Sequence, residues 1–395
     1  MKTGLSKKNM EISSSITLAI TAKAKKMKED GVDVISFGAG EPDFNTPKHI
    51  RDAAIDALDK GLTGYTAASG LPKLKEAICE KLKKENNLIY KTENVVVSNG
   101  AKHSLYNALQ AICNPEDEVI VALPYWVSYT ELVKLADATP ILVHTKEEDG
   151  FKYTKESLEK VITENTKAII LNSPNNPTGT VYTKDELKMI ADLALKNNIY
   201  IISDEIYEKL TYEGEHISIA SLGDEIKKLT IVVNGMSKAY AMTGWRIGYL
   251  ACEKEIAKII TNIQSHATSN PNTMAQYASI VALEEDQEPI QKMVEAFLER
   301  RNYMVKTINS IENLSCRNPE GAFYVMVNIS KIIGKTFKGY KINGSMDLAE
   351  YLLDKVNVAV VPGIAFGADE YIRLSYATSL ENIKEGLKRI QKAIE

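Results

Sequence analysis

The segment IVVNGMSKAYAMTGWRIGYLA, residues 231–251, places a lysine between two short apolar runs. The runs at 231–233 and 247–251 have the length and aliphatic content of strands that are buried on both faces of a sheet. Lys238 lies in the turn between them, which is no place for an ordinary solvated lysine. The same alternation of apolar runs and helical patterns extends from about residue 95 to 251. It predicts an α/β fold with helices on both faces of a mainly parallel sheet.

Seven candidate strands follow from this alternation. They span residues 95–98, 118–122, 140–143, 168–172, 199–203, 230–234 and 247–251. Between the strands lie amphipathic stretches such as residues 184–197, whose Thr183-x-x-Glu186 start fits a capping box. A helix is also expected over residues 101–112, directly after the first strand.

The pattern changes after Pro271. Apolar residues recur at helical spacing from 289 to 314, and strand-like segments and a final helix follow, at residues 322–327, 358–361 and 371–375 and after a Thr378-x-x-Glu381 start. This order predicts a second, smaller α+β domain. We therefore expect a large domain over residues 46–285 and a small domain built from residues 1–45 and 286–395. The Lys- and Gly-rich stretch 330–345 is interpreted as a flexible surface excursion.

Composition narrows the classes of protein to which the chain can belong. Its 395 residues allow one large core and a smaller one, and 44% apolar and 25% charged residues are typical of a globular enzyme. The net charge of −4 gives no footprint for nucleic acid, and no apolar run reaches the ~18 residues of a membrane helix. The N-terminus lacks a signal-peptide pattern, and the four cysteines form no C-x-x-C pair. We expect a cytoplasmic protein without a metal site.

The turn around Lys238 carries groups suited to an aldehyde cofactor that bears a phosphate. A lysine amine forms an imine (a Schiff base) with such an aldehyde, and pyridoxal 5'-phosphate (PLP) is the cofactor that pairs with it. The Ser237 hydroxyl and the Arg246 guanidinium flank the lysine and can hold the phosphate. A third anchor is the turn Gly100-Ala101-Lys102, where a strand runs into a helix, because the free N–H groups of a helix N-terminus attract an anion.

Other residues meet further demands of this chemistry. A carboxylate keeps the ring nitrogen protonated, and Asp204 stands at the carboxyl end of a predicted strand, although it could equally cap a following helix. Tyr207, three residues later, could reach the ring oxygen. The substrate carboxylate needs a planar, bidentate partner, for which Arg373 is the candidate unless it is a charge on an edge strand. Trp126 ends another strand, where a tryptophan is either core or a shelf for the ring.

These features follow the order of a known family across nearly the whole chain. The sequence contains GEPDF (40–44), GYT (64–66), the Gly100 turn, PYW (124–126), NNPTG (175–179), SDEIY (203–207), the Lys238 segment, GAFY (321–324) and RLSYA (373–377). The chain thus resembles the class I (fold-type I) PLP-dependent aminotransferases, closest to the bacterial aspartate aminotransferase subgroup. The resemblance implies a large domain with a mainly parallel seven-stranded sheet sandwiched by helices, and a smaller α+β domain.

The resemblance also implies roles that pattern alone leaves open. Asn176 bonds the ring oxygen, Trp126 stacks on the ring, and both lie beside the substrate. The backbone of Gly40 adds a donor near the substrate carboxylate. Tyr65 crosses to the phosphate of the neighbouring subunit, which implies a homodimer with sites at the interface.

Substrate choice is implied by a second set of residues. Lys102 matches the lysine that receives the distal carboxylate of the substrate in this subgroup, and a cation in the first turn of a helix is otherwise unfavourable. Ser15 and Thr17 match a stretch that closes over bound acids. His103 has no expected role beyond structure.

The implied reaction is a ping-pong transfer of the amino group between amino acids and 2-oxo acids. The expected pair is L-aspartate and 2-oxoglutarate, with Lys238 moving the proton. Specificity for glutamate, prephenate, an aromatic amino acid or alanine stays open, as does a PLP-dependent C–S lyase that shares the cofactor residues. A PLP-binding transcription regulator would need an N-terminal DNA-binding module, and a nicotinamide dehydrogenase would need a G-x-G-x-x-G turn that the sequence lacks.

Overall fold

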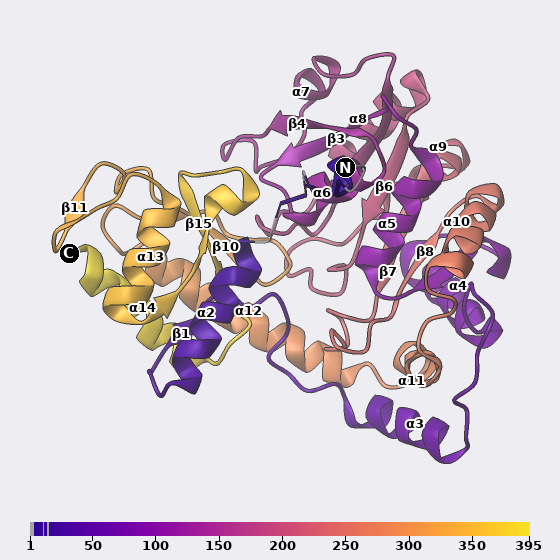
Figure 1. Cartoon of the computed structure of the whole chain (residues 1–395), viewed down its shortest axis with the longest axis horizontal. Coiled ribbons are helices and arrows are strands. Elements are labelled where there is room, and N and C mark those ends of the chain that lie inside the picture. The colour runs from indigo at the N-terminus through magenta and orange to yellow at the C-terminus, as the bar shows by residue number, and fades with distance from the viewer. Residues whose placement is uncertain (1–3, 11, 14–15) are drawn as a thin grey trace.

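The largest unit of the fold is a seven-stranded sheet. The computed structural model describes residues 4–10, 12–13 and 16–395 and gives this sheet the strand order β2-β8-β7-β6-β5-β3-β4 (Figure 1). Its strands are β2 (Val95–Ser98), β3 (Glu118–Leu123), β4 (Thr139–His144), β5 (Thr166–Asn172), β6 (Tyr200–Asp204), β7 (Thr230–Gly235) and β8 (Gly248–Ala251). Strand β8 is antiparallel to β2 and β7, and the remaining pairs are parallel. The predicted α/β fold is confirmed, with each strand within two residues of its expected bounds.

Helices cover both faces of this sheet because its strands are apolar on both sides. Val119 and Val121 of β3 enter the core under α5, α6 and α10, whereas Ile120 between them enters the core under α8. The helices of this part of the chain are α3 (Lys48–Asp59), α4 (Pro72–Asn86), α5 (Ala101–Ile112), α6 (Ser128–Leu135), α7 (Lys155–Glu159), α8 (Lys184–Asn197), α9 (Asp224–Leu229), α10 (Lys254–Ala267) and α11 (Thr273–Glu284).

Two predicted helix starts have different outcomes. Helix α8 begins with the expected capping box, because the Thr183 hydroxyl accepts from Glu186 N and the Glu186 side chain accepts from Thr183 N. For α14 (Leu380–Ile394) the predicted start at Thr378 is wrong. The N-cap is Ser379, whose hydroxyl accepts from Asn382 N. A Thr-Ser pair offers two neighbouring hydroxyls, and the register of the helix decides which of them caps it.

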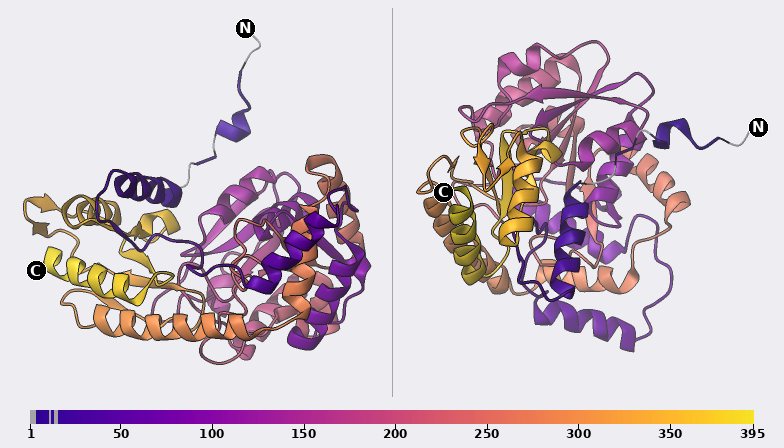
Figure 2. Two further views of the ribbon diagram at one scale, coloured as in Figure 1. Left: turned by 90° about the horizontal axis from the view of Figure 1, so that it is seen from below. Right: turned by 60° about the vertical axis from the view of Figure 1, so that its left-hand side comes forward.

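A smaller antiparallel sheet, with strand order β14-β15-β10-β9, lies beside the large one. Figure 2 shows the long helix α12 running from the large sheet to this smaller unit. Strand β1 (Ile35–Ser36) pairs in parallel with β13, so the N-terminal segment joins the C-terminal part. The remaining elements are α1 (Lys7–Met10), α2 (Ile16–Glu29), α12 (Glu288–Ile308), β9 (Ser315–Cys316), β10 (Tyr324–Asn328), α13 (Ser345–Val356), β13 (Val358–Ala359), β14 (Val361–Pro362) and β15 (Tyr371–Ser375).

The stretch 330–345 differs from its expectation. It is not a featureless excursion but contains a hairpin of β11 (Thr336–Phe337) and β12 (Tyr340–Lys341). Ile332 and Ile342, on either side of the hairpin, are fully buried. These two isoleucines therefore hold the segment against the core. Its Lys and Gly residues predicted only the part that is exposed.

Two further observations concern expectations from composition. Within the described ranges, no helix is both long enough and apolar enough to cross a membrane. All four cysteines carry free thiols.

Candidate active site

Side chains from both sheets converge at the carboxyl ends of β5, β6 and β7. Asp204 is the last residue of β6, and Lys238 follows the end of β7 by three residues. Arg373 arrives from β15 and donates from Nη1 to Asn176 Oδ1, 3.0 Å away, in the turn after β5. The carboxyl edge of an open α/β sheet is where ligands bind in such folds.

Asp204 is a buried carboxylate, and no cation of the described part of the chain is bonded to it. Its Oδ2 accepts from the Tyr129 hydroxyl at 2.8 Å, and its Oδ1 accepts from Ile206 N at 3.2 Å. Burial raises the pKa of Asp204 to about 6, although these two hydrogen bonds oppose the rise. The turn after β6 is not a helix, so the alternative that Asp204 caps one is wrong. A protonated ring nitrogen is the kind of partner that would stabilise its charge.

Lys238 is not an ordinary surface lysine. Its ammonium donates to the carbonyl oxygen of Gly40 and lies 5.8 Å from the ring centroids of both Tyr207 and Phe323. Burial lowers the pKa of Lys238 to about 8, and the charges of Arg373 and Arg246 act in the same direction. A sizeable neutral fraction near pH 8 makes the amine available as a nucleophile and as a proton acceptor.

Arg373 has the geometry of a carboxylate receptor. Strand β15 lies between β14 and β10, so the alternative of an edge-strand charge is wrong. The guanidinium is buried, stacks 4.2 Å from the centroid of Tyr324, and donates to Asn176 and, at 3.4 Å, to Gly38 O. Its Nε has no partner among the described residues. A buried donor of this kind calls for a ligand oxygen.

Two of the predicted phosphate anchors, Arg246 and the Gly100 turn, meet at the start of α5. Gly100 has φ 88°, and a Cβ there would lie 2.2 Å from Arg246 Nη2, so only glycine allows the arginine this close. Arg246 donates to Asn99 O and Thr243 O, at 3.2 and 2.8 Å. The first N–H groups of α5, at Ala101 and Lys102, receive no side-chain cap. Ser237, next to Lys238, is buried.

Trp126 and Lys102 lie together at the rim of the site. Lys102 Nζ is 4.8 Å from the Trp126 ring centroid, and Trp126 meets Tyr129 edge to face at 5.3 Å. Trp126 is only partly buried, so it is more exposed than a core tryptophan. Partial burial and the Arg246 charge lower the pKa of Lys102. His103 accepts from Asn99 N at Nδ1, 3.2 Å away, and thereby caps the turn that Gly100 cannot cap.

Two tyrosines at the site have no counterpart among the predicted residues. Tyr129 holds Asp204, and Tyr324 shares a 3.0 Å hydrogen bond with the Tyr207 hydroxyl while stacking on Arg373. Burial raises the pKa of Tyr207 well above its usual range. Tyr129 ends the segment PYWVSY (124–129) and Tyr324 ends GAFY (321–324), so both stand within or next to motifs that the sequence shows, and their hydroxyls are the signal that could have identified them.

Three expected residues lie apart from this cluster or beyond it. Tyr65 is 92% exposed and lines a hollow of about 300 Å³ with residues 63–64 and 268–274. Thr17 stands in the first turn of α2, where its carbonyl accepts from Thr21 Oγ1. Ser15 lies outside the described residues.

Comparisons with known proteins agree with this geometry. Residues 32–390 match the family model described as aminotransferase class I and II. The chain is 50% identical to an aspartate aminotransferase of Bacillus sp. over the full length of both chains, and 46% identical to a probable aspartate/prephenate aminotransferase of Aquifex aeolicus, again over both full lengths.

Solved structures give the same assignment. The aspartate aminotransferase of Rhizobium meliloti superposes with a TM-score of 0.96 at 42% identity, covering 99% of each chain. The Thermus thermophilus enzyme with maleate has a TM-score of 0.94 at 42% identity, covering 99% of this chain and 100% of that one. This chain belongs to the class I and II aminotransferases, and its cofactor is PLP.

Proposed function

We propose that this protein transfers the amino group of L-aspartate to 2-oxoglutarate by a ping-pong mechanism. The observation that carries the proposal is the convergence of three groups: the Lys238 amine, whose pKa is lowered, the Asp204 carboxylate, whose pKa is raised, and the Arg373 Nε, which has no partner among the described residues. The names of its relatives support aspartate as the amino donor.

The residues present fit PLP. The unpaired charge of Asp204 suits a protonated ring nitrogen, and the N-terminus of α5 with Ser237 and Arg246 suits a dianionic phosphate. Lys238 is the amine that would hold the aldehyde carbon. When bound, PLP supplies a conjugated ring that takes up the electron pair released at the substrate α-carbon.

The protein side of the reaction is orientation and proton transfer. Arg373 binds the α-carboxylate of the substrate, and Asn176 keeps the guanidinium in place through its 3.0 Å hydrogen bond. The Lys238 amine takes the proton from the substrate α-carbon and, in the same half-reaction, would deliver it to the cofactor carbon that carried the aldehyde. Tyr207 and Trp126 fix the plane in which this transfer occurs. The second half-reaction uses the same groups in reverse with the 2-oxo acid.

The choice of an acidic substrate is assigned to Lys102. Its ammonium at the site rim, beside Trp126, can bind the distal carboxylate of aspartate, while Ser15 and Thr17 close over the bound acid. Maleate, the ligand named for the Thermus thermophilus structure, is a dicarboxylate of aspartate length. Prephenate is the alternative acceptor, because several relatives are named aspartate/prephenate aminotransferases.

We further propose a homodimer in which Tyr65 reaches the phosphate of the neighbouring site. Tyr65 has almost no burial in the single chain, and Ile55 and Leu58 of nearby α3 are more than half exposed. Apolar and aromatic side chains of this kind gather at subunit interfaces. The hollow beside Tyr65 is a place where the second copy can insert.

The proposed domain division follows the pairing of the chain ends. A large domain of residues 46–285 holds the seven-stranded sheet, and a small domain joins residues 1–45 to 286–395. The β1–β13 pairing supports this grouping. Four free thiols favour a reducing compartment such as the cytoplasm.

The test of the reaction is a single half-reaction with the PLP-loaded protein. L-aspartate, L-glutamate, L-alanine and L-tyrosine are added separately, and the absorbance of the bound cofactor is followed. Rapid conversion by aspartate and glutamate, but not by alanine, is expected. Conversion led by tyrosine or alanine would overturn the acidic specificity. With glutamate-loaded protein, prephenate then competes with oxaloacetate as the acceptor, which decides the alternative.

The test of the dimer mixes two inactive variants, Tyr65→Ala and Lys238→Ala. A mixed dimer has one site with both native residues if Tyr65 acts across the interface, so activity should return to roughly a quarter of the wild-type value after random reassembly. Absence of recovery in a mixture that sediments as dimers would contradict the crossing.

A further inference from the structure

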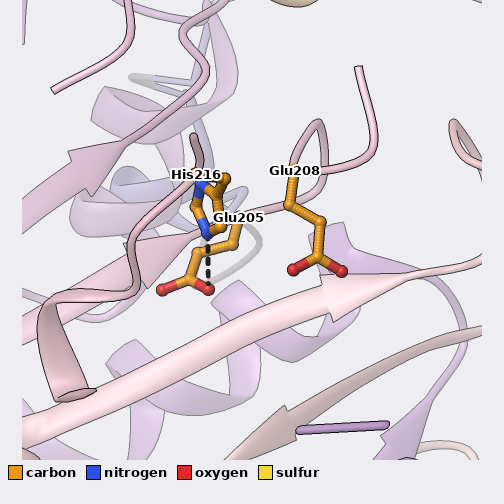
Figure 3. A group of neighbouring side chains, drawn as sticks. All are labelled: Glu205, Glu208 and His216. Atoms are coloured by element: carbon orange, nitrogen blue, oxygen red, sulfur yellow. Dashed lines mark hydrogen bonds and ion pairs between the residues drawn. The ribbon is translucent and has the colours of Figure 1, made fainter. Parts of the chain in front are cut away.

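The turn that carries Asp204 and Tyr207 has a second, buried face. Asp204 and Tyr207 contact the active site, whereas the carboxylates of Glu205 and Glu208, on the same turn, lie on the opposite side. His216 lies against this second face, and Figure 3 shows its ring joined to the Glu205 carboxylate by a hydrogen bond, with Glu208 beside them.

Two serine hydroxyls and the His216 imidazole bind the Glu205 carboxylate. Its Oε1 accepts from Ser203 Oγ at 2.9 Å and from Ser218 Oγ at 2.6 Å, and its Oε2 lies 3.1 Å from His216 Nε2. The side chains of Glu205 and His216 are only 1% and 7% exposed. The His216 imidazole is therefore the only titratable group bonded to this carboxylate among the described residues.

Glu208 has a permanent cation instead. Lys81 of α4 donates to Glu208 Oε1 and, at 2.8 Å, to Asn86 Oδ1, while Asn86 Nδ2 donates to Glu208 Oε2 at 2.8 Å. Burial would raise the pKa of Glu208, but Lys81 lowers it to about 2. Glu85, 3.6 Å from Lys81, has its own partner in Lys209 at 2.7 Å.

The charges of this buried group balance only if His216 is a cation. Glu205 and Glu208 contribute two negative charges, and Lys81 contributes one positive charge. Burial opposes protonation of His216, yet the hydrogen bond and charge of Glu205, with the charge of Glu208, raise its pKa. A buried charge without a partner of opposite sign is unfavourable, so this arrangement favours the protonated imidazole.

The same three groups could in principle hold a metal ion. The ligand atoms of Glu205, Glu208 and His216 lie within 4.8 Å of one another. However, Glu208 is already paired with the Lys81 ammonium. The positive charge that the carboxylates require is thus supplied by the protein itself.

We propose that His216, as an imidazolium, is a positioning residue for the active site: it neutralises Glu205 and so keeps a second negative charge away from Asp204, which directly precedes Glu205 in the chain. This inference rests on the proposed role of Asp204 beside the cofactor ring. The charge of Glu205 acts on Asp204, because it raises the pKa of the Asp204 carboxyl. The charge of His216 therefore acts on Asp204 by way of Glu205, and Asp204 is the residue proposed to contact the cofactor ring.

The experiment compares His216→Gln with the double variant Glu205→Gln/His216→Gln. Glutamine can still hydrogen-bond but carries no charge, so the single variant leaves Glu205 unbalanced and the double variant removes the imbalance. The readout is the pH midpoint of the absorbance change of the bound cofactor. The midpoint should rise by about 0.5–1 pH unit in the single variant and return to the wild-type value in the double variant. An exposed histidine on β4 gives the control His144→Gln, which should leave the midpoint unchanged.

A second readout uses the protein without cofactor. Because the pKa of His216 is raised in the folded state, its contribution to stability is complete below the unfolded pKa of about 6.5 and is lost as pH rises through the folded pKa. The melting temperature of wild type should exceed that of His216→Gln most at pH 6, and the difference should shrink toward pH 9. The groups that act on this titration are Glu205, Glu208 and Lys81.

Three outcomes would overturn the proposal. They are an unshifted midpoint in His216→Gln, a double variant that is shifted further than the single one, and a melting difference that does not depend on pH. Stabilisation of wild type, but not of His216→Gln, by added zinc would also overturn it, since the cluster would then be a metal site. If the single variant does not fold, the double variant and the wild-type melting profile still decide. A protein that shows no cofactor absorbance would contradict the proposed function instead, and the cofactor-free readout would still judge His216.

Discussion

The two faces of the 204–208 turn treat buried charge in opposite ways. On the active-site face, burial moves Asp204 and Lys238 toward their neutral forms, with pKa values of about 6 and about 8, and the Nε of Arg373 has no partner in the part of the chain that the structure describes. On the other face, the pKa of Glu208 falls to about 2 because Lys81 pairs with it. The cluster pairs its charges with one another, whereas in the site Asp204 and Lys238 are bonded only to neutral groups among the described residues. The same five-residue turn, 204–208, thus contributes side chains both to the active site and to the buried cluster behind it.

The largest expected effect comes from removing the amine on the active-site face. Lys238→Ala loses both the attachment point and the proton carrier, so the rate of the aspartate half-reaction should fall by about 10⁴-fold. Single-turnover absorbance with saturating aspartate measures it. Lys146→Ala, at an exposed lysine, is the control and should match wild type. A Lys238→Ala protein that kept a tenth of the rate would refute the assignment.

The next effect concerns the closed cluster. Glu208→Gln leaves the Lys81 ammonium buried without its carboxylate, and breaking such a pair should cost about 3–5 kcal/mol of unfolding free energy. Urea unfolding of the cofactor-free protein measures it. The matched control is Glu225→Gln, which removes an exposed ion pair with Lys228 and should leave the midpoint where it is. Equal losses of unfolding free energy in both variants would mean that the buried Lys81–Glu208 pair contributes no more to stability than an exposed ion pair.

The large sheet could be predicted because each of its strands carries a local signal. Continuous aliphatic runs bounded by turn residues are sufficient to indicate buried parallel strands. The smaller sheet is harder to predict. Residues 358–361 form one apolar run, but the structure divides it into β13 and β14, which pair with β1 and β15 respectively. A strand of two residues is recognisable only from the strand with which it pairs. When that partner is distant in the chain, the local sequence contains no pattern that predicts the pairing.

The site divides in the same manner. Lys238, Asp204 and Arg373 could be predicted because their chemistry demands those residue types within recognisable motifs. Tyr129 could not, since it is 75 residues from Asp204 in sequence and becomes its partner only in the folded sheet, where β5 alone separates β6 from β3, the strand that precedes α6 and Tyr129. The charge balance around Glu205 is also invisible in sequence, because it depends on which side of the turn each carboxylate faces.

A smaller effect is expected at the rim of the site, where Lys102 is exposed to solvent. Lys102→Ala should lower kcat/KM for aspartate about ten- to a hundred-fold, because one charge-assisted contact is worth roughly 1.5–3 kcal/mol. L-alanine has no distal carboxylate, so its slow reaction serves as the internal control and should not change. An unaltered kcat/KM for aspartate would show that another group receives that carboxylate.

The smallest expected effect comes from removing the charge of Asp204. This change should stabilise the cofactor-free protein, whereas removing the charge of Glu208 should destabilise it, so the pair of variants tests the contrast between the two faces most sharply. Asp204 has a folded pKa of about 6 against 3.8 in the unfolded chain, so its ionisation is disfavoured by folding. The stability of the cofactor-free protein should therefore fall as pH rises from about 4 to about 6 and stay lower above that range. Asp204→Asn removes this cost and should stabilise the cofactor-free protein at pH 7 by about 1–2 kcal/mol, within the roughly 3 kcal/mol that two pKa units allow. The same change should weaken PLP binding, because the ring nitrogen loses its partner. A variant destabilised at pH 7, as Glu208→Gln is expected to be, would mean that Asp204 is satisfied by the protein alone and that the site is as closed as the cluster behind it.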